Sequence, residues 1–219
     1  MRRLWALGVA FGQDFFQRLY GWLGPRFFSR NYFERRYSKP DPWHYQNSPY
    51  EQLKYQRTLE ILPKREFKKI LEIGCSEGVF TQKIAGLTQE VLGVDISTMA
   101  LERAQRRCAH LKNVRFQPLD IVKDQIENGF DLIFCAEVLY YLGKREVLQK
   151  ICAKIVGSLT YDGYLVLVNA WPASKRLHLV FQEHPQLQLV QEEVYEDKLR
   201  PYAISLFKKR RSQVGTLTR

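Results

Sequence analysis

The sequence lacks several features that define common classes of protein. No apolar run approaches the eighteen or so residues that a membrane-spanning helix needs. The four cysteines form no CxxC pair and the histidines show no metal-ligand spacing, so we expect neither a disulfide framework nor a bound metal. There is also no internal repeat and no low-complexity tract. These absences indicate a globular, cytoplasmic protein of a reducing compartment.

The net charge of +11 is concentrated at the two ends of the chain. Residues 1–40 carry eight basic and two acidic residues, and residues 208–219 carry five basic and no acidic ones. The segment 41–207 is neutral, which argues against a nucleic-acid partner. The basic ends favour an anionic surface such as a lipid headgroup layer. For the basic tail, residues 209–219, a solvated segment without a partner is the simpler interpretation.

Residues 1–30 predict an amphipathic, basic helix, because large apolar side chains recur at helical spacing between Leu4 and Leu23. Two interpretations stay open. The helix lies on a membrane, which would place the protein peripherally at its inner face, or it docks on its own domain. No small-residue cleavage site follows the apolar patch before Asp14, which disfavours a signal peptide.

Residues 31–66 are expected to form an aromatic lid segment followed by a capping helix. Positions 31–47 are rich in aromatic residues, and Pro40 and Pro42 break regular structure there, so we expect an irregular segment. Ser48 then fits a helix N-cap, Pro49 the first turn and Glu51 the reciprocal position of a capping box. This helix should end near residue 62.

Residues 67–208 predict an α/β domain in which strands and helices alternate. Short strands rich in Ile, Leu and Val are expected at 69–73, 90–95, 114–119, 130–135 and 164–169, with a closing antiparallel pair at 187–195 and 202–208. Helices are expected between most strands, notably at about 77–86, 98–110 and 144–158. The pattern predicts a Rossmann-like, doubly wound, mostly parallel seven-stranded sheet with helices on both faces and an antiparallel final strand.

A small-residue turn follows the first of these strands and opens a helix. In this turn, Gly74 and Gly78 let the backbone come close to a ligand, and Ser76 is small enough for the same purpose. Ligands of such folds bind at this carboxyl edge of the sheet.

Two carboxylates follow the next two strands. Asp95 lies 21 residues after Gly74, where it can accept hydrogen bonds from the ribose hydroxyls of an adenosine ligand. Asp120 ends the third strand, where it can accept from an adenine amino group, with Ile96 and Ile121 flanking the ring. The order and spacing of these groups predict a nucleoside-type cofactor.

This set resembles the class I S-adenosyl-L-methionine-dependent methyltransferases, whose glycine turn has the pattern acid-x-Gly-x-Gly-x-Gly. Here the pattern is Glu72-x-Gly74-x-Ser76-x-Gly78, with serine in place of the middle glycine. The GxGxxG spacing that is usual for nicotinamide cofactors is absent. The resemblance implies S-adenosyl-L-methionine as cofactor and implies that Glu72 helps to hold its methionine end.

A narrower resemblance covers about residues 32–170. The segments Asp41-Pro42-Trp43-His44-Tyr45, Ser48-Pro49-Tyr50-Glu51-Gln52-Leu53-Lys54-Tyr55, Glu72-Ile73-Gly74-Cys75-Ser76-Glu77-Gly78 and Ala136-Glu137-Val138-Leu139-Tyr140-Tyr141-Leu142 are similar to the nodulation protein S family. The Gly-Cys-Ser-x-Gly turn is itself typical of that family. The resemblance implies methylation of a sugar-type acceptor, such as the free amine of a chitooligosaccharide.

Four side chains are candidates for the acceptor site. Glu137 follows the fourth strand and is the first candidate for holding or deprotonating the acceptor, although a helix N-terminal carboxylate is an equally good interpretation. His44 is the second candidate, but a lone loop histidine is more often exposed. Tyr140 and Tyr141 are candidates for stacking on a sugar, with one of them expected in the core.

Four further residues complete the predicted cofactor site. Trp43 covers the cofactor or stacks on a sugar face. Lys54 can pair with the cofactor carboxylate, although a solvated helix face is the commoner role of such a lysine. Cys75 is expected to be present for its size, and Cys135 to meet the cofactor through its backbone.

The fold does not fix the acceptor, so two alternatives remain. The chain can be a methyltransferase for another small metabolite, or a membrane-associated protein that binds the cofactor without turnover. The oligomeric state is not indicated by the sequence.

Overall fold

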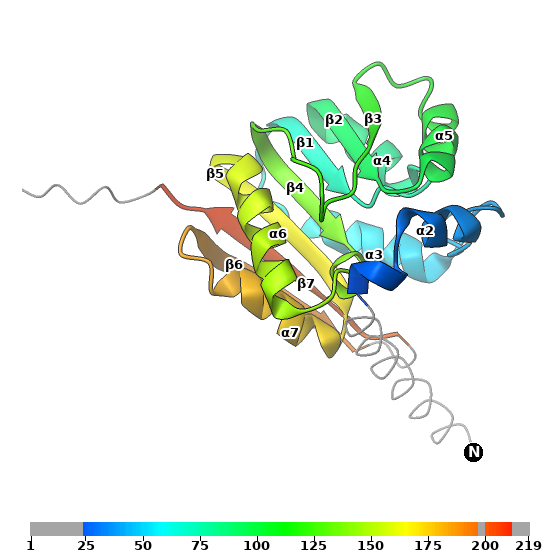
Figure 1. The fold of residues 1–219 in the computed structure, drawn as a ribbon. Helices are drawn as coiled ribbons and strands as arrows, with labels where there is room; N and C mark the ends of the chain where they lie inside the picture. The colour runs from blue at the N-terminus through cyan, green and yellow to red at the C-terminus, as the bar shows by residue number, and fades with distance from the viewer. Residues whose placement is uncertain (1–23, 197–199, 212–219) are drawn as a thin grey trace, which may run out of the picture.

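Seven strands form one sheet in the computed structural model, which describes residues 24–196 and 200–211 (Figure 1). The strands are β1 (Phe67–Ile73), β2 (Thr88–Asp95), β3 (Val114–Pro118), β4 (Phe130–Ala136), β5 (Leu159–Ala170), β6 (Leu187–Tyr195) and β7 (Tyr202–Lys209). Their order is β3-β2-β1-β4-β5-β7-β6. The first five are parallel, and β7 runs antiparallel to both of its neighbours. The predicted mostly parallel sheet with an antiparallel final strand is confirmed.

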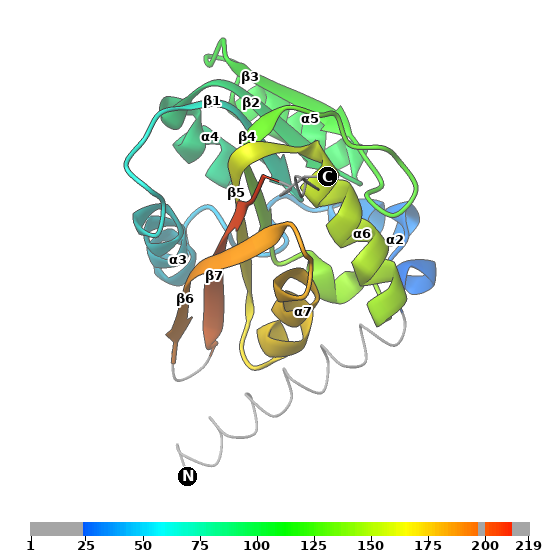
Figure 2. The same cartoon turned by 90° about the vertical axis from the view of Figure 1, so that its left-hand side faces the viewer.

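Helices cover both faces of this sheet because alternate strand residues point to opposite sides. On one face, Ile70 packs with apolar residues of α3 (Pro49–Glu60) and α4 (Val79–Ile84). On the other face, Leu71 shares a core with α6 (Arg145–Ser158) and α7 (Ala173–Gln182). Figure 2 shows these two pairs of helices on opposite sides of the sheet. The helix α5 (Thr98–Arg107) lies against β2 and β3.

The carboxyl ends of the five parallel strands therefore meet at one edge. Strand order reverses between β1 and β4, since β1 leads on to β2 and β3 whereas β4 leads on to β5. Such a switch point leaves a crevice beyond the strand ends, where ligands of open α/β sheets bind.

The lid region differs from its prediction in two ways. The segment expected to be irregular contains α2 (Arg30–Arg36), because Pro40 and Pro42 come after this helix and break only the loop that follows it. Ser48 caps α3 as predicted, accepting the N–H of Glu51 at 3.4 Å. The predicted reciprocal bond of the capping box, from the Glu51 side chain back to the N-cap, is wrong, because the Glu51 carboxylate pairs with Lys54 instead.

Residues 1–23 of the predicted N-terminal helix and most of the basic tail lie outside the described residues. Within the residues that are described, no helix is long and apolar enough to span a membrane.

Candidate active site

The turn from β1 to α4 has three residues in the left-handed backbone region. Gly74, Ser76 and Gly78 have φ values of 77°, 52° and 77°. A Cβ at Gly74 would lie 2.4 Å from Cγ2 of Val138, so this close approach requires glycine. A Cβ at Gly78 would lie 3.0 Å from that of Ala104, so this glycine serves the packing of α5 against the turn. Ser76 holds a conformation that side chains disfavour.

The Asp95 carboxylate is fixed at the end of β2. Its two oxygens accept the backbone N–H groups of Ser76 and Ser97, each at 2.9 Å. Burial raises the pKa of Asp95 to about 6, against the effect of these hydrogen bonds. Each oxygen keeps a further lone pair, so the carboxylate can accept a pair of vicinal hydroxyls at the sheet edge.

A first cavity at this edge brings most of the predicted cofactor residues together. Its lining includes Trp43, Gly74, Ser76, Asp95, Ile96, Asp120, Ile121 and Glu137. The strand assignment of Asp120 is wrong, because β3 already ends at Pro118. The Asp120 carboxylate still reaches the cavity wall, where it accepts the N–H of Val122 at 3.1 Å and pairs with Lys123 at 3.1 Å.

A second cavity adjoins the first. Five residues line both of them: Tyr45, Gly74, Ser76, Ala136 and Glu137. The second cavity also reaches Lys54, Glu72 and Cys75. The hydroxyl of Thr81 donates to the buried Glu72, and burial raises the pKa of this carboxyl to about 8. The two cavities together offer one elongated site.

The two cysteines predicted at the site are buried. Cys75 lines the second cavity, and burial raises the pKa of its thiol well above the usual value, which makes it a poor nucleophile. Cys135 lies in β4, outside the lining of both cavities, and burial raises its pKa to about 12. Cys75 is therefore a small packing group of the second cavity, whereas Cys135 belongs to the core that the sheet shares with α6 and α7, and its predicted contact with the cofactor is not supported by the cavity lining.

Helix α2 closes the site from the lid side. The Glu34 carboxylate accepts the N–H groups of Thr98 (2.8 Å) and Met99 (3.2 Å), which begin α5, and the hydroxyl of Ser97 (2.8 Å). An anionic side chain at a helix N-terminus satisfies unpaired N–H groups and interacts favourably with the helix dipole. The sequence analysis missed Glu34, since nothing in the sequence pairs it with a helix more than sixty residues away.

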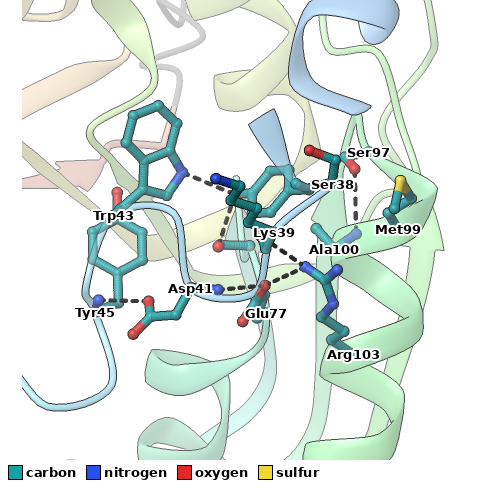
Figure 3. A network of polar contacts seen from close by, with 12 residues as sticks. Ser38, Lys39, Asp41, Trp43, Tyr45, Glu77, Ser97, Met99, Ala100 and Arg103 are labelled. Carbon is teal, nitrogen blue, oxygen red and sulfur yellow. Dashed lines mark hydrogen bonds and ion pairs between the residues drawn. The ribbon is translucent and has the colours of Figure 1, made fainter. Parts of the chain in front are cut away.

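The loop after α2 is held by Glu77, which lies in the glycine turn itself. Figure 3 shows the Glu77 carboxylate between this loop and α5. It accepts the N–H of Asp41 at 3.0 Å and pairs with Arg103 at 2.7 Å. Arg103 also donates to the carbonyl of Lys39 at 3.2 Å. The lid is thus bonded directly to the turn that shapes the cofactor site.

Trp43 and His44, both predicted at the site, face different ways. Trp43 lines the first cavity, donates to the Tyr37 hydroxyl at 3.3 Å and carries the Arg36 guanidinium 4.5 Å above its ring centroid. His44 has a φ of 58° and an exposed side chain, and it lines neither cavity.

Glu137 lies where the two cavities meet. It follows β4 with a φ of 56°, and its N–H donates to the carbonyl of Val168 at 2.8 Å. Glu137 precedes a short 3₁₀ helix, η2 (Leu139–Tyr141), but its carboxylate accepts from Lys54 and from no N–H of this helix among the described hydrogen bonds, so its interpretation as a helix N-terminal carboxylate is wrong. The solvated position expected for Lys54 is also wrong. The ammonium is buried and donates to Glu137 at 3.1 Å.

The two tyrosines predicted to line the acceptor site lie in different surroundings. Tyr140 packs against the core that α6 shares with the sheet and lines neither cavity, whereas Tyr141 lines the first cavity.

Comparison with known proteins assigns the family. The sequence profile of the family described as nodulation protein S (NodS) matches residues 28–203. The chain belongs to the NodS family. Nodulation protein S of Bradyrhizobium diazoefficiens is 33% identical over 140 residues, which are 63% of this chain and 66% of that protein. The protein of Rhizobium tropici is 30% identical over 141 residues, 64% of this chain and 59% of that protein.

The chain therefore spans slightly less than two thirds of these NodS relatives. The solved N-methyltransferase NodS from Bradyrhizobium japonicum, in complex with S-adenosyl-L-homocysteine, superposes with a TM-score of 0.76 at 25% identity, over 83% of this chain and 98% of that one. Phosphoethanolamine N-methyltransferase 1 of Arabidopsis thaliana is 30% identical over 110 residues, 49% of this chain and 22% of that protein. The NodS match includes the lid as well as β1 to β6.

Proposed function

We propose that the protein is an S-adenosyl-L-methionine-dependent methyltransferase that methylates an amine, or a hydroxyl, of a sugar or oligosaccharide acceptor. One observation carries the proposal: the glycine turn, Asp95 and Asp120 line a single cavity at the carboxyl edge of the sheet. Membership of the NodS family supports the same conclusion.

The residues of the two cavities fit this cofactor. Asp95 would accept from the ribose hydroxyls, and Asp120 from the adenine amino group, with Ile96 and Ile121 against the ring. Glu72, in the second cavity, would hold the methionine end of the cofactor. Gly74 and Ser76 line both cavities, so a bound cofactor would lie beside the glycine turn. Trp43 would cover the site from the lid.

The bound cofactor would supply a methyl group already activated by a sulfonium. The protein's own contribution is then to align the acceptor and to exclude water. The lid excludes water, because its bonds to α5 and to the glycine turn close one side of the first cavity. Glu137 would hold the acceptor at the junction of the cavities, and an amine acceptor would lose its proton to Glu137 or to water before transfer.

The acceptor class is supported by the character of the cavity and by the relatives. Aromatic rings of the lid and of the segment after β4 line the first cavity, and such rings can stack on sugar faces: Phe28, Phe33, Tyr37, Trp43, Tyr45 and Tyr141. The likeness to a phosphoethanolamine N-methyltransferase makes a small phosphorylated amine the second candidate. Both candidates share a primary amine.

Residues 1–30 are proposed to contact a membrane peripherally. Among the described residues of this segment, Arg26, Phe27 and Arg30 are exposed, and Phe27 exposes 52% of its surface. Deleting residues 1–23 should abolish binding to vesicles of anionic phospholipid. Unchanged binding would reject the membrane contact, and zwitterionic vesicles serve as the control for charge.

Calorimetric titration tests the cofactor first. S-adenosyl-L-methionine should bind with micromolar affinity and NAD should not. A panel of glucosamine, de-N-acetylated chitobiose and phosphoethanolamine then tests the acceptor by formation of S-adenosyl-L-homocysteine. N-acetylglucosamine, which has no free amine, is the matched control. Cofactor binding without any product would favour a binding protein without turnover, whereas turnover of phosphoethanolamine alone would reject the sugar.

A further inference from the structure

A buried ion cluster lies on the second cavity, between α3 and the end of β4. The Lys54 ammonium lies 2.9 Å from Oε2 of Glu51 and 3.1 Å from Oε1 of Glu137. The Lys54 and Glu51 side chains are almost completely buried, and that of Glu137 is 16% exposed. Burial lowers the pKa of Lys54, but attraction to Glu137 and Glu51 outweighs it and leaves the pKa above its usual value. This lysine is therefore charged.

The cluster also contains Arg200, whose guanidinium lies 3.6 Å from Oε1 of Glu51. Three tyrosines and one histidine near Glu137 are neutral at pH 7. Tyr50 of α3, Tyr45 of the lid loop and Tyr140 have pKa values raised by burial. His178 of α7 has a pKa lowered by burial. Among the described ion pairs of Glu137, the partner is Lys54. Lys54 is thus the cation that can orient this carboxylate.

The backbone holds Glu137 at the junction of the two cavities. Its left-handed φ of 56° is kept in place by the 2.8 Å bond from its N–H to the carbonyl of Val168. One carboxylate oxygen is occupied by Lys54, which leaves the other for a ligand in the cavities. A cation fixed on one side of a carboxylate orients it and stabilises its charged form.

We propose that Lys54 is a positioning residue that keeps Glu137 ionised and aimed at the junction of the cavities, where its second oxygen receives the primary amine of the acceptor. This inference rests on the proposed methyl transfer. It assigns an amine rather than a hydroxyl, because a carboxylate stabilised by a buried cation is a weak base for a hydroxyl and a good hydrogen-bond acceptor for an amine.

The transfer itself explains why a negative charge is useful here. The N–C bond forms as the bond between sulfur and methyl breaks, and the electron pair of that bond stays on sulfur. Positive charge therefore moves from sulfur to nitrogen, and the product is a methylated ammonium beside Glu137. A charge fixed in advance at the place where charge develops lowers the barrier without reorganisation. The ammonium later releases its extra proton to water.

Variants of Lys54 test the proposal without a known acceptor. Lys54→Met removes the cation that two buried carboxylates share, although Glu51 keeps Arg200 at 3.6 Å. Because this variant can fail to fold, Lys54→Met/Glu51→Gln is made beside the single variant Glu51→Gln. Carbon-13 NMR of labelled glutamate side chains, recorded on the complex with S-adenosyl-L-homocysteine, follows the titration of Glu137. Its resonance is assigned by its absence in Glu137→Gln. Calorimetry gives the affinity for S-adenosyl-L-homocysteine in each variant.

We expect the pKa of Glu137 to be at least about one unit higher in Lys54→Met/Glu51→Gln than in Glu51→Gln. The affinity for S-adenosyl-L-homocysteine should change less than about threefold, and Lys54→Arg should restore the titration. An unchanged Glu137 titration would overturn the proposal. An affinity loss of tenfold or more would also overturn it, since Lys54 would then hold the cofactor carboxylate. Failure of the wild-type protein to bind S-adenosyl-L-homocysteine would instead reject the proposed function.

Discussion

The hydroxyl of Tyr37 donates a 2.7 Å hydrogen bond to Oγ of Ser76, and this bond joins the lid to the glycine turn. Tyr37 is buried and its oxygen also accepts from Nε1 of Trp43. Ser76 stands where the class I pattern has glycine, in a left-handed conformation that disfavours a side chain. The backbone strain at Ser76 is therefore accompanied by a hydrogen bond from Tyr37 that a glycine could not accept through a side chain.

Replacing Ser76 with glycine should loosen the lid without unfolding the protein. The change removes the acceptor of Tyr37 and at the same time relieves the left-handed backbone. A buried hydrogen bond contributes about 0.5–1.5 kcal/mol, so we expect bound S-adenosyl-L-homocysteine to dissociate roughly 2- to 10-fold faster. Stopped-flow displacement measures this rate.

Tyr37→Phe is the partner variant for this prediction, because it keeps the ring and removes the same bond from the other side, together with the acceptor of Nε1 of Trp43. If the effect of Ser76→Gly comes from this bond, the double variant should release the ligand at a rate similar to that of Tyr37→Phe alone. Additive effects in the double variant would mean that the two residues act independently.

Asp95 should control both cofactor affinity and the pH dependence of stability. Asp95→Ala loses a charge-assisted pair of hydrogen bonds to the ribose, which should weaken S-adenosyl-L-methionine binding roughly tenfold or more. Unchanged affinity in calorimetry would mean that the ribose lies elsewhere.

The pKa of Asp95 gives the sign of the pH effect without cofactor. Because burial raises this pKa from 3.8 to about 6, the folded state binds more protons than the unfolded state between these values. The contribution of Asp95 to the free energy of unfolding should therefore fall as pH rises from about 4 to 6. Urea denaturation of the wild type and of Asp95→Asn measures the difference, which should vanish near pH 4 and favour the variant at pH 7.

Glu72 should release a proton when the cofactor binds. Its pKa of about 8 in the free protein, raised by burial, leaves it largely protonated at pH 7. A cationic methionine end beside it would favour the carboxylate and lower this pKa. Binding should then release protons and strengthen as pH rises from 6 to 8.

Calorimetry in buffers of different ionisation enthalpy measures these protons at pH 7. Glu72→Gln is the isosteric control, and the release attributed to Glu72 should disappear in it. Equal proton release in both proteins would place the cationic end away from Glu72.

The succession of strands and helices along the chain was easier to predict from the sequence than the contacts between distant segments. The turn at Gly74 and the carboxylates after β2 and β3 were predictable, because parallel strands bring their carboxyl ends to one edge. Lys54 was expected on a solvated face, because its buried partner, the carboxylate of Glu137, lies 83 residues away in the sequence. Glu34 was missed for the same reason. Such long-range contacts depend on how the lid packs, and no local periodicity of the sequence indicates them.

Glu34 should anchor the lid through the first turn of α5. Glu34→Ala removes the acceptor for the N–H groups of Thr98 and Met99 and for the Ser97 hydroxyl, which should lower the free energy of unfolding by about 1–2 kcal/mol. Hydrogen bonds to the carboxylate outweigh its partial burial and hold the pKa of Glu34 below its usual value, so this contribution should be lost as pH falls through that lowered pKa.

Glu102→Ala, a change at an exposed position of α5, is the control for Glu34→Ala. Urea denaturation gives the free energies, and hydrogen exchange at Met99 localises the effect. Exchange that is equally slow in both variants would show that α5 begins stably without the lid.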